Sequence, residues 1–493
     1  MGFKADSSFL RFLTMGAVGV RRTITQLRKQ GFRPIELERY CASNKIWTTK
    51  VKRLRLPDLL CVRTGLRVEV RAKSDLAIKM SDSPDNPDRR WDAGLRDDDL
   101  AAFIYSSSDA LGKGAASDAI FFRIEDLRRS IDTSKLGPPK SASEGSERDR
   151  SWPATVPKRD GQVLEVTPTK VVTLLDATET HSARRQTYHL KSKTPYLSEG
   201  DRFRARASFL AGTPPSTAVL SAYAAKTFDP FLLLESSNDV DRYAAVKSFP
   251  YRHDSVESVL NVLEYLLSRE PDDRIKLEAA GSAAYFGSAL GKEMIQDYVW
   301  NKTTSDQFRM ESVFILTELR ESDFVHDTLL RIARDKQFAG NEVRQAAVWG
   351  LGKTGLRAYE NLIPFIDDEE YEVALHAIVA LGADVSERAI RDVVAKLGSD
   401  NPREAAAASE ALRTIGTAEV VSLLLAALSD WGDDNSWVVA TLGRLSPDLV
   451  RKLCTDHSLR SKLEPFFRLS ETMNPFTSEQ ALTDFGFLRQ QQL

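Results

Sequence analysis

The 493-residue sequence predicts a multidomain protein with an N-terminal α/β domain, a small β-rich domain in the middle and a C-terminal all-α solenoid. Three observations predict this architecture. A helix with small residues on one face recurs about every 30 to 35 residues through the C-terminal half, whereas the strand-like alternation of apolar and polar residues dominates residues 160–225. The first 132 residues combine one amphipathic helix with short apolar runs, and the chain is too long for a single core.

Composition excludes several classes of protein. Hydrophobic residues make up 42% and charged residues 28% of the chain, so a fibrous or wholly disordered protein is excluded. The nearest candidate for a membrane span, residues 9–20, is interrupted by Arg11 and is shorter than the roughly 18 residues that a span needs. The expected location is the cytoplasm. Three distant cysteines without a CxxC pair indicate neither a disulfide framework nor a zinc site, and we expect them to be buried: Cys41, Cys61 and Cys454.

Charge is distributed unevenly along the chain. The first hundred residues contain 21 Lys and Arg against 13 Asp and Glu, a net charge of about +8. Residues 251–493 carry about −13, although the whole chain carries only −2. A basic head joined to an acidic tail predicts that nucleic acid binds at the N-terminal end only.

The N-terminal domain, residues 1–132, is expected to begin with a helix at residues 19–30. Val20, Ile24 and Leu27 share one face of this helix, and a glycine ends it at position 31. A mixed sheet and a closing helix should follow. The expected strands are residues 34–38, 48–55, 58–62, 66–71 and 119–124, with a turn at 63–65, and the further expected helices are residues 97–105 and 125–131.

The residues that indicate chemistry lie in RLRLPDLLCVRTGLRVEVRAK, residues 53–73. Pro57-Asp58 begins one expected strand, and Glu69 lies on the next strand, two residues before Arg71. This pattern resembles the PD-(D/E)XK nucleases, with Arg71 in place of the family's lysine and Lys73 two residues further on. The resemblance covers about 120 residues. It implies a restriction-endonuclease-like mixed sheet of αβββαβ order.

Two carboxylates on adjacent strands can hold a Mg²⁺ or Mn²⁺ ion that polarises a phosphate and activates a water, while a nearby cation stabilises the developing charge. If Thr64-Gly65 forms a two-residue loop, Asp58 lies opposite Arg71, on the sheet face that Glu69 and Lys73 share. A three-residue loop would turn Asp58 to the other face. The predicted catalytic residues are Asp58, Glu69, Arg71 and Lys73, of which the two acids are the predicted metal ligands.

Two departures from the family pattern leave alternatives open. Arginine does not give up a proton and holds phosphate differently from lysine, so either Lys73 takes over the lysine's role or the domain has lost cleavage and kept binding. The resemblance also implies a third acid on the first helix, but GAVGVRRTITQL contains none. Glu36 or Glu38 on the following strand would then have to be the third metal ligand.

Cations around the candidate site are expected to contact the phosphate backbone, although alternating cations on a strand are also typical of a solvated face. Trp91, which follows two of them, is expected in the core rather than as a platform for stacking a base. The predicted nucleic-acid-binding residues are Lys50, Lys52, Arg53, Arg55, Arg89 and Arg90.

The middle of the chain predicts a linker followed by a small domain. Residues 133–160 are rich in Ser, Pro, Gly, Glu and Lys, which is typical of a flexible linker. Residues 161–235 should form the β-rich domain, with a last strand near residues 217–223. His181 and His189 lie close together but have no metal-ligand pattern beside them, so we expect surface or packing roles.

The solenoid is expected at residues 236–465, with a cap or tail at 466–493. Its recurring helix appears in segments such as RIKLEAAGSAAYFG, EVRQAAVWGLGKTG and EVALHAIVALGA, whose small residues allow close helix packing. The segments resemble short HEAT repeats; the alternative is an unrelated helical bundle. Solenoids offer long surfaces to partners, so the resemblance implies recognition of a protein. The seven helices are centred on Ala245, Ala280, Ser312, Ala347, Ala377, Ala411 and Thr441.

Three hypotheses about function remain. The first is a Mg²⁺-dependent endonuclease, with DNA a better candidate substrate than RNA, whose solenoid binds a partner or senses a signal, as in bacterial restriction or phage defence. The second is a nucleic-acid-binding adaptor without cleavage. The third is a structural scaffold in which PD and EVR are coincidental. The chain lacks GxxxxGK[ST], HExxH and GxSxG motifs, so nucleotide hydrolysis, zincin proteolysis and serine hydrolysis have no support.

Overall fold

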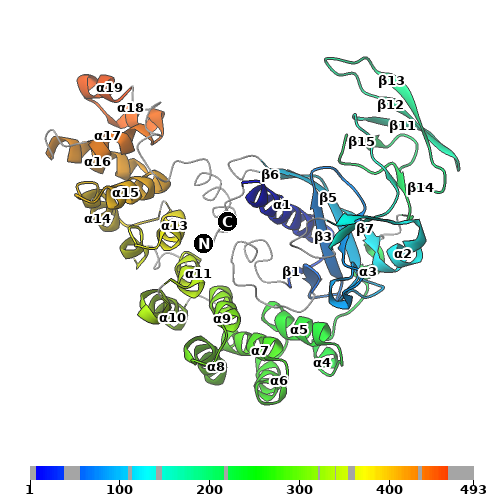
Figure 1. Cartoon of the computed structure of the whole chain (residues 1–493), viewed down its shortest axis with the longest axis horizontal. Helices are drawn as coiled ribbons and strands as arrows, with labels where there is room; N and C mark the ends of the chain where they lie inside the picture. Colours follow the sequence, from blue (N-terminus) through cyan, green and yellow to red (C-terminus); the bar gives the residue numbers. More distant parts are fainter. Residues whose placement is uncertain are drawn as a thin grey trace.

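A computed structural model gives the fold, in which a solenoid of helix pairs curves around an N-terminal domain built on a β-sheet (Figure 1). Helix α1 and strand β1 of the N-terminal domain face the inner side of the solenoid, whereas strands β11–β13 of the middle region project away from it (Figure 1). The structure describes residues 7–37, 56–108, 114–139, 147–215, 220–319, 322–338, 340–353, 361–382, 384–430 and 436–464.

The N-terminal sheet has the strand order β1-β2-β3-β5, with β6 and β7 both paired to β5. Strands β1, β2 and β3 form an antiparallel meander, β3 and β5 are parallel, and β7 returns antiparallel to β5. A helix followed by three strands agrees with the expected order, but the restriction-endonuclease likeness stays a prediction. The strands are β1 (Pro34–Glu36), β2 (Leu59–Cys61), β3 (Arg67–Lys73), β5 (Leu100–Ser108), β6 (Gly114–Ala116) and β7 (Ile120–Arg123).

The helix predicted at residues 97–105 is wrong, because this segment forms the central strand β5. Residues 100–104 are all fully buried, since both faces of the sheet are covered. A strand buried on both faces has no polar residues at alternate positions, so its sequence resembles a helix segment. The predictions of a strand at 119–124 and of a helix at 125–131 are confirmed by β7 and by α2 (Ile124–Arg129).

Helix α1 (Ser7–Lys29) covers one face of this sheet. The prediction of a helix over residues 19–30 is confirmed, and the helix begins a further twelve residues earlier. Val20 and Leu27 are buried in the core that α1 shares with β2, β3 and β5. Close approach depends on Gly19, where an added Cβ would lie 2.8 Å from the Cβ of Ala72 on β3. Gly31 ends the helix with a φ of +85°, in the region that favours glycine.

The opposite face of the sheet is covered by a second small sheet of β4 (Lys79–Asp82), β9 (Arg148–Ser151) and β8 (Lys135–Pro139). A flexible linker was expected at residues 133–160, but the described part of this segment is largely extended and paired. Its charged residues pair across strands, as Lys79 does with Asp149 and Arg150 with Asp82. Composition alone did not reveal these cross-strand ion pairs; the domain boundaries stay a prediction.

The middle region contains two small sheets with the orders β13-β12-β11-β15 and β10-β16-β14. These sheets confirm the expected β-rich character. The prediction of a strand near 217–223 is wrong for its last residues, where helix α3 (Ser221–Ala224) forms. Tyr223 of α3 packs in the core beneath α1. The strands are β10 (Ala154–Thr155), β11 (Gly161–Val166), β12 (Lys170–Leu175), β13 (Arg184–His189), β14 (Thr194–Pro195), β15 (Arg202–Phe203) and β16 (Ala211–Gly212).

The solenoid is a stack of inner and outer helices, led by α4 (Pro230–Leu233). The seven small marker residues found in the sequence are all fully buried on the inner helices, so the predicted period is confirmed. The inner helices are α5 (Asp239–Ser248), α7 (Asp273–Tyr285), α9 (Asp306–Glu318), α11 (Glu342–Leu351), α13 (Tyr371–Ala380), α15 (Pro402–Ile415) and α17 (Ser436–Gly443). Among the described residues the others are α6 (Val256–Arg269), α8 (Ala289–Trp300), α10 (Asp323–Arg334), α14 (Glu387–Lys396), α16 (Ala418–Asp430), α18 (Pro447–Leu453) and α19 (His457–Leu463).

Arginines near the start of inner helices hold successive repeats together. Arg344 on α11 donates to the carbonyl of Ala333, 2.9 Å away near the end of α10, and pairs with Asp368 before α13. Arg309 on α9 donates in the same way to the carbonyl of Val299 near the end of α8, 3.2 Å away. Each arginine satisfies a carbonyl that the end of a helix leaves without an intrahelical partner, which helps to fix the angle between repeats.

Candidate functional site

The predicted catalytic residues lie on the β2–β3 hairpin. Leu59 pairs with Val68 and Leu60 with Arg67, so continuing the register by one residue places Asp58 opposite Glu69. The expected opposite partner was Arg71, two residues further on. The turn is longer than expected, because the backbone N–H of Cys61 donates to the carbonyl of Leu66 and leaves residues 62–65 as the loop. Because side chains alternate between the two faces of a sheet, a register shift of two residues does not change the face of a side chain. The register therefore still places Asp58 on the sheet face of Glu69, Arg71 and Lys73.

Glu69 is buried and forms an ion pair with Arg71 on the same strand. Asp58 accepts a hydrogen bond of 2.6 Å from the backbone N–H of Val70. The parallel register places Arg71 beside Phe103 and Lys73 beside Tyr105 on β5, and both cations are only partly exposed. The site is therefore a largely covered strip of sheet in which a buried carboxylate already has a cationic partner.

Glu36 is not brought together with Asp58 and Glu69. It pairs with Leu59 in the β1–β2 register, which places it on the face that carries α1, opposite to the face of Glu69. Burial, and next the negative charge of Glu318, raise the pKa of Glu36, so its carboxyl lies close to inner helices of the solenoid. Within the described ranges no group of three His, Cys, Asp or Glu side chains is placed to hold a metal ion. The alternative ligand Glu38 lies outside the described residues.

The predicted nucleic-acid-binding residues are only partly described. Arg89 and Arg90 are exposed in the turn that follows β4, where their role stays a prediction. The prediction that Trp91 lies in the core is confirmed, because its side chain is buried and packs edge to face against Trp152, with 5.0 Å between the ring centroids. The other four predicted cations lie outside the described residues: Lys50, Lys52, Arg53 and Arg55.

Arg67, for which the sequence suggested no role, links the candidate site to the solenoid. Its side chain, 2% exposed, donates to both carboxylate oxygens of Asp99, at 2.8 and 2.5 Å. A third donor lies 3.2 Å from Asp241 on α5, and Arg96 pairs with the same aspartate. The sequence could have indicated this ion pair, because Arg67 lies in the largely apolar segment 66–70. A cation in such a segment is costly to bury unless it has a partner of opposite charge.

Apolar packing reinforces this junction. Leu37, Leu56 and Leu60 belong to the same continuous core as the first solenoid helices. Gly65 in the hairpin turn lies against the ring of Phe228, where an added Cβ would be 2.9 Å from a ring carbon. Arg252, beyond α5, donates to the carbonyl of Val62 at 2.7 Å. The candidate strand and the start of the solenoid are therefore packed as one unit.

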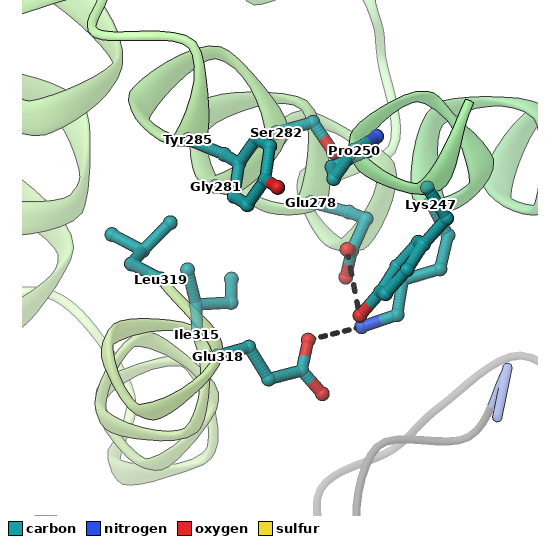
Figure 2. A pocket seen from close by; sticks show the side chains of 10 residues that line it. Lys247, Pro250, Glu278, Gly281, Ser282, Tyr285, Ile315, Glu318 and Leu319 are labelled. Atoms are coloured by element: carbon teal, nitrogen blue, oxygen red, sulfur yellow. Dashed lines mark hydrogen bonds and ion pairs between the residues drawn. The ribbon is translucent and has the colours of Figure 1, made fainter. Parts of the chain in front are cut away.

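A second candidate site, which sequence reasoning missed, is a pocket on the inner face of the solenoid between α5, α7 and α9 (Figure 2). It has about 380 Å³ of empty space, part of it open to solvent. Lys247, 3% exposed, points between Glu318, with which it forms an ion pair, and Glu278 at 3.6 Å (Figure 2). Tyr243 donates a hydrogen bond of 2.8 Å to the other oxygen of Glu278. The signal in the sequence was a lysine directly after the small residues of the first repeat, AAVKSF.

The remaining candidates give no cluster. Cys61 and Cys454 are buried as expected, and Cys41 lies outside the described residues. His181 and His189 are exposed. In the part of the chain that the structure describes, no helix is both long enough and apolar enough to cross a membrane.

Comparisons with known proteins bear on the solenoid. A comparison with curated proteins found no match. Two engineered proteins solved by the Northeast Structural Genomics Consortium are similar over about half of this chain. One is 16% identical, with 49% of this chain and 77% of the other covered and a TM-score of 0.25; the second is 17% identical, with 50% and 96% covered and a TM-score of 0.15. Residues 359–443 match the family model of HEAT repeats, and the C-terminal region is a helical solenoid consistent with that match.

Proposed function

We propose that this protein is a scaffold that joins a nucleic acid, bound by its N-terminal domain, to a protein partner bound by its HEAT-like solenoid. The observation that carries the proposal is the buried ion pair between Arg67 and Asp241, which fixes the candidate strand β3 to the first inner helix. A partner bound along the inner helices would thereby be held at a fixed position relative to the N-terminal sheet.

The nucleic-acid part of the proposal is supported by charge and by motif. The first hundred residues carry about +8, and the PD…EVR pattern resembles a domain that handles nucleic acids. Cations near a sheet can bind phosphates without cleaving them. The proposal prefers DNA to RNA, as the nuclease resemblance suggests.

A second candidate function, a Mg²⁺- or Mn²⁺-dependent endonuclease, is favoured by the pairing of Asp58 opposite Glu69. Carboxylate oxygens suit either metal ion. Within the described residues no third acid joins these two carboxylates in a group that could hold a metal ion, because Glu36 lies on the other face of the sheet, and Glu69 is engaged by Arg71. The fit to a metal is therefore incomplete, and we place binding without cleavage first. A role in restriction or phage defence would follow from the second candidate.

One experiment separates the two functions. The full chain is mixed with a supercoiled plasmid in Mg²⁺ or Mn²⁺, and in parallel its DNA binding is measured by gel shift at several salt concentrations. The scaffold predicts binding that weakens steeply with salt and no nicking. Nicking by the wild type that disappears in both Asp58→Asn and Glu69→Gln would establish the endonuclease. Absence of DNA and RNA binding would remove the nucleic-acid part of the proposal.

A further inference from the structure

We infer that a group of exposed cations at the end of α1, before β1 and in the β2–β3 turn binds the phosphate backbone of double-stranded DNA. This inference rests on the proposed scaffold function and gives its nucleic-acid part a site. The group, called the basic end below, consists of Arg28, Lys29, Arg33 and Arg63, and all four residues are exposed.

Three stretches of the chain meet at the basic end. Arg28 and Lys29 lie in the last turn of α1. Only four residues later, Arg33 lies beside Val62, whose backbone N–H donates to the carbonyl of Arg33 at 3.0 Å. Arg63 is the next residue along that neighbouring stretch. The backbone therefore gathers the four cations at one end of the N-terminal domain.

The cations of the basic end form no ion pair within the part of the chain that the structure describes. Elsewhere in this domain even exposed arginines have acidic partners, as Arg22 has in Asp118 and Arg129 has in Glu125. A paired cation is partly neutralised by its partner, whereas an unpaired one keeps its attraction for an anion that approaches from solvent. The unpaired cations are therefore the ones that a phosphate would reach.

Negative groups nearby do not cancel this charge. Asp254 is engaged by Arg252, the residue that also donates to the carbonyl of Val62. Asp229 is exposed and caps α4, so it opposes only one of the four cations. The C-terminal end of α1 contributes about half a negative charge, which the two cations in its last turn outweigh. A net positive charge therefore remains at the basic end.

The chemistry of this surface suits a duplex backbone. Guanidinium groups match the oxygens of a phosphate in pairs and are weakly hydrated, so three arginines favour this ligand. Phe32 and Phe228, the aromatic residues beside the basic end among those described, are buried and offer no platform on which single-stranded bases could stack. Contacts to phosphates carry no sequence information, so we expect binding without sequence preference.

The position of Arg63 connects this surface to the solenoid. Its carbonyl accepts a hydrogen bond of 3.1 Å from the backbone N–H of Phe228, which leads into α4. The turn is thus fixed from behind, and its side chain is exposed on the outside. DNA bound at the basic end would lie beside the first repeat, which is where the scaffold function needs it.

The test measures binding of a fluorescent DNA duplex of about 20 base pairs to the full chain by anisotropy, between about 50 and 200 mM NaCl. A variant with all four cations of the basic end replaced by glutamine should bind about 10²-fold or more weakly. Arg63→Gln alone should reduce the slope of log K against log salt by about 1, because each phosphate contact releases a counterion.

A matched control removes the same amount of charge from the solenoid. It replaces by glutamine four exposed cations that likewise form no ion pair among the described residues, and it should keep the wild-type affinity to within about threefold, since only the distant field changes. The four control residues are Lys302, Arg334, Lys336 and Arg388.

Several results would overturn the basic end as the DNA site. Equal weakening in the two fourfold variants would show an effect of net charge alone. Wild-type affinity in the first variant would move the DNA site elsewhere and leave the scaffold proposal standing, whereas absence of DNA binding by the wild type would remove both. Competition by polyglutamate as effective as that by unlabelled duplex would assign the surface to an acidic protein. If a thermal melt shows that the fourfold variant is unfolded, Arg33→Gln and Arg63→Gln decide, each with an expected loss of about fivefold.

Discussion

Arg67 on β3 lies 3.2 Å from Asp241 on α5, an ion pair that spans 174 residues of sequence and is buried between the two halves of the molecule. Asp99 holds the same guanidinium from the N-terminal side. Asp99 thus depends on Arg67, and Asp241 shares Arg67 and Arg96, in a place with little access to water. Two residues along the same strand face lies Glu69 of the candidate site, so the geometry of that site depends on this contact.

Replacement of Arg67 by methionine should lower the free energy of unfolding by about 3 to 5 kcal/mol, because it leaves Asp99 buried without its cation and Asp241 with Arg96 alone. Urea unfolding followed by circular dichroism measures the change. The control is Arg129→Ala, which removes a salt bridge to Glu125 whose arginine is largely exposed, and should cost less than about 1 kcal/mol. Equal effects of the two substitutions would contradict the junction.

Replacement of Glu36 by glutamine should raise the urea midpoint at pH 7. The pKa of Glu36 is raised in the folded protein by burial and by Glu318, so between its ordinary pKa and its raised folded pKa the native state binds more protons than the unfolded chain. The stability that this proton contributes is complete below the unfolded pKa and is lost as pH rises through the folded pKa. The variant should therefore match the wild type near pH 4 and exceed it at pH 7. A less stable variant at pH 7 would contradict this assignment.

Lys353 should make stability depend on alkaline pH. Burial lowers its pKa from 10.5 to about 8, and Arg21 contributes in the same direction. Between pH 8 and pH 10.5 the unfolded chain binds more protons than the native state, so stability rises with pH in this window. The shift corresponds to about 3 kcal/mol as an order of magnitude. The urea midpoint should change more between pH 8 and pH 10 in the wild type than in Lys353→Met. An equal change in both proteins would show that Lys353 does not cause this pH dependence.

Replacement of Ala377 by arginine should destabilise the protein by several kcal/mol, since the residue is fully buried on α13 and the new side chain brings both volume and charge. Thermal melting measures the loss. Asp392→Arg on the exposed side of α14 introduces the same side chain on the surface and should change stability by no more than about 0.5 kcal/mol. A native melt for Ala377→Arg would refute the repeat register.

The substitution Arg71→Lys tests whether the hairpin is a decayed nuclease. The scaffold function predicts that neither the wild type nor this variant nicks a plasmid in Mg²⁺ or Mn²⁺, because the described residues provide no group of three ligands for a metal ion. If the wild type is inactive and Arg71→Lys restores nicking, the domain descends from an active enzyme that lost its lysine. If the wild type does cleave and Lys73→Ala loses about 10²-fold of the rate, Lys73 has taken the lysine's role.

The solenoid could be predicted from sequence because its order is local. The small residues of the inner helices meet side chains about one period away, as Gly281 meets Ile315 and Gly350 meets Thr317, and the period is visible in the sequence. The hairpin was found for a similar reason, since Asp58 and Glu69 are only eleven residues apart. Arg67 could not be assigned, because its partner Asp241 lies 174 residues away. Strand β5 was mistaken for a helix, because its cover on both faces comes from distant segments.

The apolar residues that the N-terminal domain contributes to the solenoid core, Leu37, Leu56 and Leu60, have a consequence for how the chain acquires its structure. A ribosome releases these residues before α5, so the first repeat meets a ready surface on which to dock. Nucleation of the array should then start at that end and propagate toward α19, because an isolated helix pair buries too little area to persist alone. The sheet domain serves in this sense as a template that gives assembly of the repeats a direction.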